Sequence, residues 1–227
     1  MGLRPRTLAL VLVAAAVCPS TPLVVLGMPE LHAACRAAIA ALREARPDAL
    51  VVVGGGEATR SYEAGAAGTL RPWGVDRTAG DGKPVLPLSL TVARLLLGDD
   101  APQGLQSVAF DAATRDCLAL GERLGGSGDR VALLVMADGS ACLSPRAPGR
   151  HDEAAGPYQE GIAKAVATGE PAALAALDPA EADRLWVSGR AALQVLAGAA
   201  GGRTFQGRLL AETAPYGVGY LAGAWLS

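Results

Sequence analysis

Two short, almost continuously apolar runs constrain the fold more than any other feature of the chain. Residues 49–56 read "ALVVVGGG" and residues 130–136 read "RVALLVM". Strands that lack an alternation of apolar and polar residues are typical of sheets that are covered by helices on both faces. The sequence therefore predicts an α/β fold, a three-layer α/β/α arrangement around a mostly parallel central sheet.

A helix between two apolar runs supports the parallel sheet. Pro29 and Glu30 open a segment in which apolar residues recur at helical spacing up to Leu42, and Pro47 ends it. A strand, a helix and a second strand in this order form a βαβ unit with parallel strands. Strand 106–110 and strand 130–136 extend the sheet, and two further strands flank Pro215.

The rest of the chain is divided among helices and loops. Residues 60–87 are rich in Gly, Pro and charge, so we expect a long excursion with a small hairpin around Trp73. Residues 89–97 predict a short helix. We expect Asp111 to cap a helix that runs through about Leu124 and Asp178 to cap another within the helical region 153–200.

The 227 residues are expected to form a single domain. The predicted cellular location depends on how the first segment is interpreted. We interpret residues 1–17 as the first buried strand, followed by a loop and a helix start. In the alternative interpretation, Arg4, Arg6, an apolar run and an Ala14-x-Ala16 site form a secretory signal. The first interpretation predicts a cytoplasmic protein, and the second predicts a secreted one in which residues 1–16 are the signal.

Charge and cysteine usage exclude several functions. The formal net charge is −2, and the Lys and Arg residues are scattered, which argues against a nucleic-acid surface. We find no stretch with the length and flanks of a membrane span. The four cysteines have no CxxC spacing, so we expect buried free thiols and no zinc site.

Polar residues at the carboxyl ends of the strands are the site candidates, because ligands of such sheets gather there. The candidate catalytic residues are Ser20, Glu57, Asp138, Ser140 and His151. The candidate pocket residues are Cys18, Gly55, Cys142, Glu212 and Tyr216. Glu57 is either a pocket carboxylate or a solvated loop residue, and Asp138 is either a functional carboxylate or an Asp turn before Gly139.

Two further interpretations concern side chains that the sequence places near one another. One interpretation is a catalytic triad of Ser140, His151 and an aspartate. The G-x-S-x-G segment that would present the serine is absent from the sequence. Tyr216 and Tyr220 stand at alternate positions of a closing strand and are expected to share one of its faces.

Four stretches resemble a known family: "AAAVCPSTPLVV", "LVVVGGGEAT", "VALLVMADGSACLSPRAPGRHDEAAGPYQE" and "APYGVGYLAGAW". Together they are similar to an actinobacterial, uncharacterised branch of the LigB-like class III extradiol dioxygenases, distant relatives of the Memo-type proteins. The resemblance spans almost the whole chain and implies a LigB-type α/β domain. Working members hold ferrous iron with two histidines and one carboxylate and open a catechol ring with dioxygen.

The resemblance breaks down at the metal ligands. Ser20, Glu57 and Ala141 stand where the family has histidines, although Asp138 keeps the aspartate of the third stretch. Glu212 is the candidate for the C-terminal glutamate. Iron(II) oxygenases need imidazole nitrogens, so we expect no metal and no cofactor. The alternative is Fe(II) or another divalent cation, held by Glu57 and Asp138.

Three hypotheses follow from these residues. The first is a LigB-like protein without the iron triad that is no longer a dioxygenase and keeps a cleft for a small molecule or a protein partner. The second is an active oxidoreductase or hydrolase with a rebuilt, carboxylate-rich metal site. The third is a structural or interaction subunit, and a homo-oligomer is possible under each hypothesis.

Overall fold

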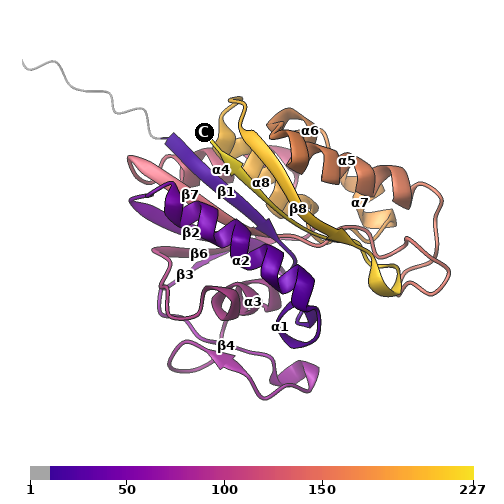
Figure 1. The fold of residues 1–227 in the computed structure, drawn as a ribbon, viewed down its shortest axis with the longest axis horizontal. Coiled ribbons are helices and arrows are strands. Elements are labelled where there is room, and N and C mark those ends of the chain that lie inside the picture. Colours follow the sequence, from indigo (N-terminus) through magenta and orange to yellow (C-terminus); the bar gives the residue numbers. More distant parts are fainter. Residues whose placement is uncertain (1–10) are drawn as a thin grey trace, which may run out of the picture.

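The computed structural model describes residues 11–227 and shows the predicted three-layer α/β/α architecture (Figure 1). A seven-stranded sheet has the order β3-β6-β2-β7-β1-β9-β8. Its strands are β1 (Val11–Cys18), β2 (Ala49–Gly56), β3 (Arg60–Tyr62), β6 (Gly104–Ala109), β7 (Arg130–Met136), β8 (Gln206–Thr213) and β9 (Tyr220–Leu226). Strands β6, β2, β7 and β1 are parallel, whereas β3 and β9 pair antiparallel with their neighbours.

Strand β1 lies in the interior of the sheet, between β7 and β9. The predicted first strand is therefore confirmed over Val11–Cys18, while residues 1–10 lie outside the described part of the chain. Ala14 and Ala16, the positions of the alternative cleavage site, are fully buried within this strand. Their small side chains leave room for helix α2 (Pro29–Glu44) to pack against the sheet.

Helices cover both faces of the sheet because successive residues of each central strand point to opposite sides. Val51, Val53 and Leu133 face one hydrophobic cluster, and Val52 and Leu134 face the other. On the first face lie α4 (Thr114–Gly125), α5 (Ala155–Thr168), α6 (Pro171–Ala175), α7 (Pro179–Arg184) and α8 (Arg190–Ala200). On the second lie α1 (Leu23–Leu26), α2 and α3 (Leu88–Leu97).

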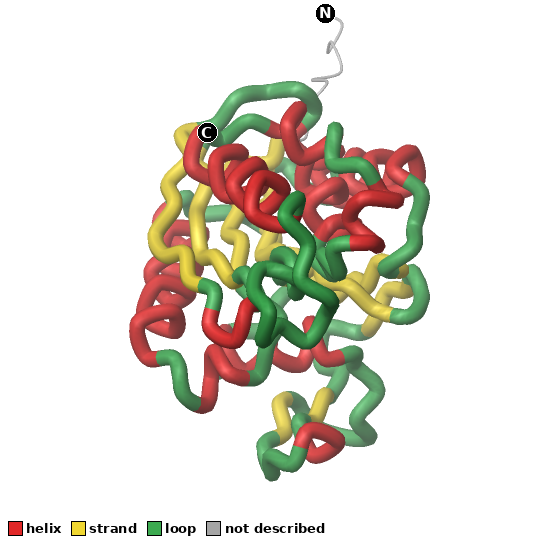
Figure 2. The backbone as a smooth tube through the Cα atoms, turned by 90° about the vertical axis from the view of Figure 1, so that its right-hand side faces the viewer, coloured by secondary structure: helices red, strands yellow, loops and turns green. Residues whose placement is uncertain are grey.

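The long excursion contains the expected hairpin. Strands β4 (Gly68–Thr69) and β5 (Thr78–Ala79) pair antiparallel around the 3-10 helix η1 (Arg71–Trp73). Figure 2 shows this segment as a small lobe that projects from the lower end of the molecule. None of its residues lines the pocket at the strand ends, so it takes no part in the site described below.

Two local predictions are wrong and one is confirmed. Asp111 does not cap α4, because that helix begins at Thr114 and its N-cap is Ala113 in extended conformation. Tyr216 and Tyr220 do not share a strand face: Tyr216 occupies the 3-10 turn η2 (Pro215–Gly217), whereas Tyr220 begins β9 and is buried. Asp178 does cap α7, since its carboxylate accepts a hydrogen bond of 2.7 Å from the Glu181 N–H.

None of the helices within residues 11–227 has both the length and the apolar character needed to cross a membrane.

Helices α4 and α8 approach each other at two glycines. A Cβ atom on Gly121 would overlap the carbonyl oxygen of Val195, and one on Gly198 would overlap that of Leu118. Both neighbours are backbone atoms, so the helices could admit a methyl group only by moving apart. This contact fixes α8, whose first residue, Arg190, lines the pocket described below.

We expect Gly121→Ala to lower the free energy of unfolding by about 1–3 kcal/mol, because overpacking a rigid contact forces backbone shifts. Gly161→Ala is the matched control, since Gly161 lies within α5 with open space around its Cα. The control should raise stability by about 0.5–1 kcal/mol through helix propensity. Urea unfolding of both variants measures this difference, and equal effects would contradict the close contact.

Candidate functional site

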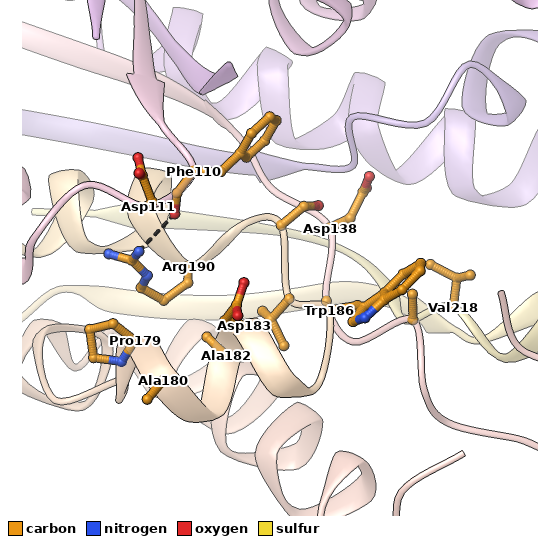
Figure 3. Close-up of a pocket in the computed structure, with 14 residues that line it drawn as sticks. Phe110, Asp111, Asp138, Pro179, Ala180, Ala182, Asp183, Trp186, Arg190 and Val218 are labelled. Atoms are coloured by element: carbon orange, nitrogen blue, oxygen red, sulfur yellow. Dashed lines mark hydrogen bonds between the residues drawn. The ribbon is translucent and has the colours of Figure 1, made fainter. Parts of the chain in front are cut away.

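A pocket of about 800 Å³ lies at the carboxyl ends of β6 and β7 (Figure 3). Phe110 and Asp111 follow β6 directly, and Asp138 follows β7. The opposite wall is formed by α7 and the start of α8, with Asp183, Trp186 and Arg190. The pocket thus combines two aromatic rings, three carboxylates and one guanidinium group at the edge of the sheet where α/β proteins bind ligands.

Asp138 joins the ends of two neighbouring strands. Its carboxylate accepts a hydrogen bond of 2.8 Å from the backbone N–H of Ser20, which follows β1. Its own carbonyl oxygen accepts a bond of 2.9 Å from the N–H of Gly189, just before α8. These bonds hold the half-buried aspartate between β1, β7 and the helical wall.

The surroundings of Asp138 favour its neutral form. Burial raises the pKa of this carboxyl group to about 7, although the N–H groups of Ser20 and Thr21 stabilise the ionised form and work in the opposite direction. A carboxyl group with this pKa can accept or release a proton near neutral pH. The site therefore offers an acid–base group at the edge of the pocket.

Backbone bonds fix the segment that follows Asp138. The N–H of Gly139 donates to the carbonyl of Gly219 at 2.8 Å, and the N–H of Gly219 donates to the carbonyl of Ser140 at 2.8 Å. The side chain of Gln159, from α5, accepts a further bond of 3.2 Å from the Ser140 N–H. The pocket edge is thus held by three segments that are distant in the sequence.

Arg190 is buried, with 3% of its surface exposed, and no carboxylate lies within salt-bridge distance among the described residues. Its guanidinium group donates to the carbonyl oxygens of Phe110, at 2.7 Å, and Ala112, and to Gln194 Oε1 at 3.0 Å. These bonds tie the loop after β6 to α8. Arg190 therefore positions Phe110 and Asp111 at the pocket.

The two aromatic rings of the pocket are exposed. Phe110 has 44% and Trp186 has 57% of its surface accessible, although large apolar side chains are usually buried in a core. Trp186 has a positive φ of 52°, a conformation that non-glycine residues rarely adopt. This conformation closes the end of α7, where the Trp186 N–H donates to the Asp183 carbonyl at 3.1 Å and the Val187 N–H donates to the Ala182 carbonyl at 2.8 Å.

The structure places Asp138 in the pocket, and Ser20 beside it through its backbone N–H. Glu57 does not line the pocket; it is an exposed residue in the short connection between β2 and β3. Its carboxylate is solvated, which is the second of the two interpretations that the sequence allows. Gly55 is buried in β2 and packs directly against the ring of Phe110.

Ser140 and His151 are not brought together as a triad. The Ser140 hydroxyl is buried and donates a hydrogen bond of 2.7 Å to the carbonyl of Leu185. It also accepts a bond of 3.1 Å from the N–H of Cys142. His151 is exposed and does not line the pocket. Ser140 is thus bound to the backbone and holds the loop in place.

The candidate cysteines are buried and have no features of reactive thiols. A hydrogen bond with the Cys35 thiol and burial hold the pKa of Cys18 well above its usual value. Burial also raises the pKa of Cys142. Reactive cysteines need the opposite shift and exposure to solvent. All four cysteines of the chain are free.

The remaining candidates lie outside the pocket wall. Glu212 is exposed on β8 and accepts a hydrogen bond of 3.4 Å from the Gln159 amide. Tyr216 is 74% exposed in its turn, whereas its neighbour Val218 does line the pocket.

Sequence reasoning missed much of the pocket wall. It predicts Phe110 only as the end of a strand and Asp111 only as a helix cap. It places Asp183, Trp186 and Arg190 in a helical region and predicts no functional role for them. The only sequence signal for this wall is Trp186, a bulky aromatic residue between charged and small residues. The sequence does not show where this side chain lies in the fold.

The donor atoms of the site do not match a ferrous-iron triad. Ala141 lines the pocket but has no ligating side-chain atom, Ser20 directs its backbone N–H to Asp138, and Glu57 lies outside the pocket wall. Within residues 11–227, His, Cys, Asp and Glu side chains form no cluster of three or more that could hold a metal ion. The residues at these positions therefore do not fit the group that the resemblance implies.

Comparison with known proteins supports the fold alone. No known protein family and no curated protein matches the sequence. The fold is similar to the crystal structure of an uncharacterised protein, JW3007, from Escherichia coli K12. The match has a TM-score of 0.58 and 15% sequence identity, and it covers 93% of this chain and 99% of the other.

The raised pKa of Asp138 predicts a pH dependence of stability. Between the unfolded pKa of about 3.9 and the folded pKa of about 7, the folded state binds more protons than the unfolded state. Stability contributed by this group is therefore present below pH 4 and is lost as the pH rises through 7. The loss is on the order of a few kcal/mol at most.

We expect Asp138→Asn to remove this loss, because an amide keeps an acceptor for the Ser20 N–H and does not titrate. Unfolding free energies of wild type and variant, measured in urea from pH 4 to pH 8, should converge at low pH and diverge above it, with the variant more stable. Asp81→Asn, at an exposed loop position, is the control. Parallel curves for wild type and Asp138→Asn would contradict the prediction.

Proposed function

We propose that this protein is a LigB-like protein without the iron triad that binds a small molecule in the pocket at the strand ends. The observation that carries the proposal is the 800 Å³ pocket itself, in which exposed Phe110 and Trp186 rings lie near the Asp138 carboxyl group. A cavity with apolar walls and a few fixed polar groups is typical of a ligand site. The backbone bonds around Asp138 supply the rigidity that such a site needs.

The pocket supports a binding role more strongly than inherited ring cleavage. The resemblance places metal histidines at Ser20, Glu57 and Ala141, and none of these side chains supplies a nitrogen ligand. The alternative pair, Glu57 and Asp138, does not meet at the pocket wall. We therefore propose that neither ferrous iron nor another divalent cation is a resident cofactor.

The buried thiols support a reducing, cytoplasmic location, which we keep as part of the proposal. A protein partner or a homo-oligomer is compatible with the pocket. A purely structural role is the competing hypothesis, and the experiments below separate it from ligand binding.

The loss of the iron triad predicts the absence of ring cleavage. After incubation with ferrous iron without oxygen and removal of free metal, we expect much less than one iron per chain. Addition of catechol and dioxygen should give no ring-opened semialdehyde in an absorbance assay. Stoichiometric iron together with accumulating semialdehyde would overturn the proposal.

A pocket-blocking variant tests ligand binding directly. Ala180 is an exposed residue of α7 that lines the pocket, so Ala180→Trp should obstruct part of the cavity at little cost in stability. Ala37→Trp, at an exposed position of α2 that does not line the pocket, is the matched control.

We expect a fragment library screened by ligand-observed NMR to yield compounds that bind wild type and Ala37→Trp and lose at least tenfold in affinity for Ala180→Trp. This loss corresponds to about 1.4 kcal/mol. Fragments that bind all three proteins equally, or a screen without binders, would favour the structural hypothesis.

Acid–base catalysis is a second candidate function, and the pKa of Asp138, raised to about 7 by burial, favours it. Such a group is matched to proton transfer at neutral pH. In this case the chain is an active enzyme, an oxidoreductase or a hydrolase, with Asp138 as the proton-transferring group. Conversion of a bound ligand should then be lost in Asp138→Asn and retained in Asp81→Asn.

A further inference from the structure

We propose that the pocket selects a ligand in which an amine or quaternary ammonium group is attached to an aromatic or apolar body. The inference rests on the proposed small-molecule function and specifies the chemical class of the ligand. It follows from the aromatic walls, the unpaired carboxylates and the orientation of the arginine that lines the pocket.

Two aromatic side chains stand on opposite walls of the cavity. Phe110 stands on the sheet side of the cavity and Trp186 on the helical side, and both are exposed (Figure 3). The face of an aromatic ring attracts ammonium groups, and tryptophan is the best of the aromatic residues in this respect. By contrast, Trp225 is fully buried in the core and donates to the Val166 carbonyl, so its ring is closed to any ligand.

The same cavity is lined by exposed carboxylates. Asp111 and Asp183 line the cavity from opposite sides, and both are exposed. Neither forms a salt bridge with any described residue. Arg184, next to Asp183 in the chain, pairs instead with Asp152 and Glu181. Two carboxylates without cationic partners among the described residues therefore face the same cavity as the aromatic rings.

Arg190 does not offset these charges inside the pocket. It is 3% exposed, and its N–H groups are directed at two carbonyl oxygens and the Gln194 amide. An anionic ligand would share the cavity with Asp111 and Asp183, whereas the guanidinium N–H groups are already bonded within the protein. The charges that a ligand can touch are therefore predominantly negative, which favours a cation.

Three probes that share a phenyl ring test the charge preference. They are benzyltrimethylammonium, benzyl alcohol and phenylacetate, titrated into wild type by calorimetry at low ionic strength and again with added salt. We expect the ammonium to bind at least tenfold more tightly than phenylacetate, and added salt to weaken its binding.

Variants locate the binding to the proposed groups. Asp183→Asn and Trp186→Ala should each weaken ammonium binding about five- to tenfold, while Asp81→Asn should leave it unchanged. Asp183 is exposed, so its substitution does not threaten the fold, and circular dichroism verifies this for both variants.

The outcomes separate this inference from the proposed function. If phenylacetate or benzyl alcohol binds as tightly as the ammonium, the charge preference is overturned. If that binding is also weakened in Ala180→Trp, the pocket still stands as a ligand site. Ammonium binding that is unaffected by Asp183→Asn and Trp186→Ala would also overturn the charge preference. Failure of all three probes contradicts the inference, and the fragment screen then decides the proposed function by itself.

Discussion

Burial of β7 on both faces determines where chemistry can occur in this protein. From Val131 to Met136 every side chain is packed against one helical layer or the other, so this strand can present a functional group only after it ends. The first polar side chain after it is Asp138. Because β1, β2 and β6 run parallel to β7, their ends reach the same edge, and the pocket forms there.

The elements of the sheet were predictable because burial leaves a direct trace in the sequence. The run "RVALLVM" predicted β7 to the residue, and Pro29 marked the beginning of α2. Asp138 was predictable as a strand-end residue for the same reason. Glu57 also follows a buried strand, but it does not reach the pocket. The chain turns immediately after β2 into β3, which pairs antiparallel with β6, and the connection that contains Glu57 is exposed.

The helical wall of the pocket could not be predicted from periodicity. Apolar spacing over residues 153–200 indicates helices but does not say which helix end reaches the strand ends. That placement depends on contacts between distant residues, such as the Gly121 and Gly198 approach and the bonds from Arg190 to the loop after β6. The left-handed backbone of Trp186 closes α7, and the sequence does not reveal it because the glycine that usually occupies such a position is absent.

The position of β1 has a consequence for how the chain folds. This strand is synthesised long before its hydrogen-bonding partners, which are residues 130–136 on one side and 223–226 on the other. Its pairing is therefore delayed until those residues have left the ribosome, and long-range pairing of this kind slows folding. During that interval the apolar segment lacks its partner strands and can associate with other exposed apolar segments.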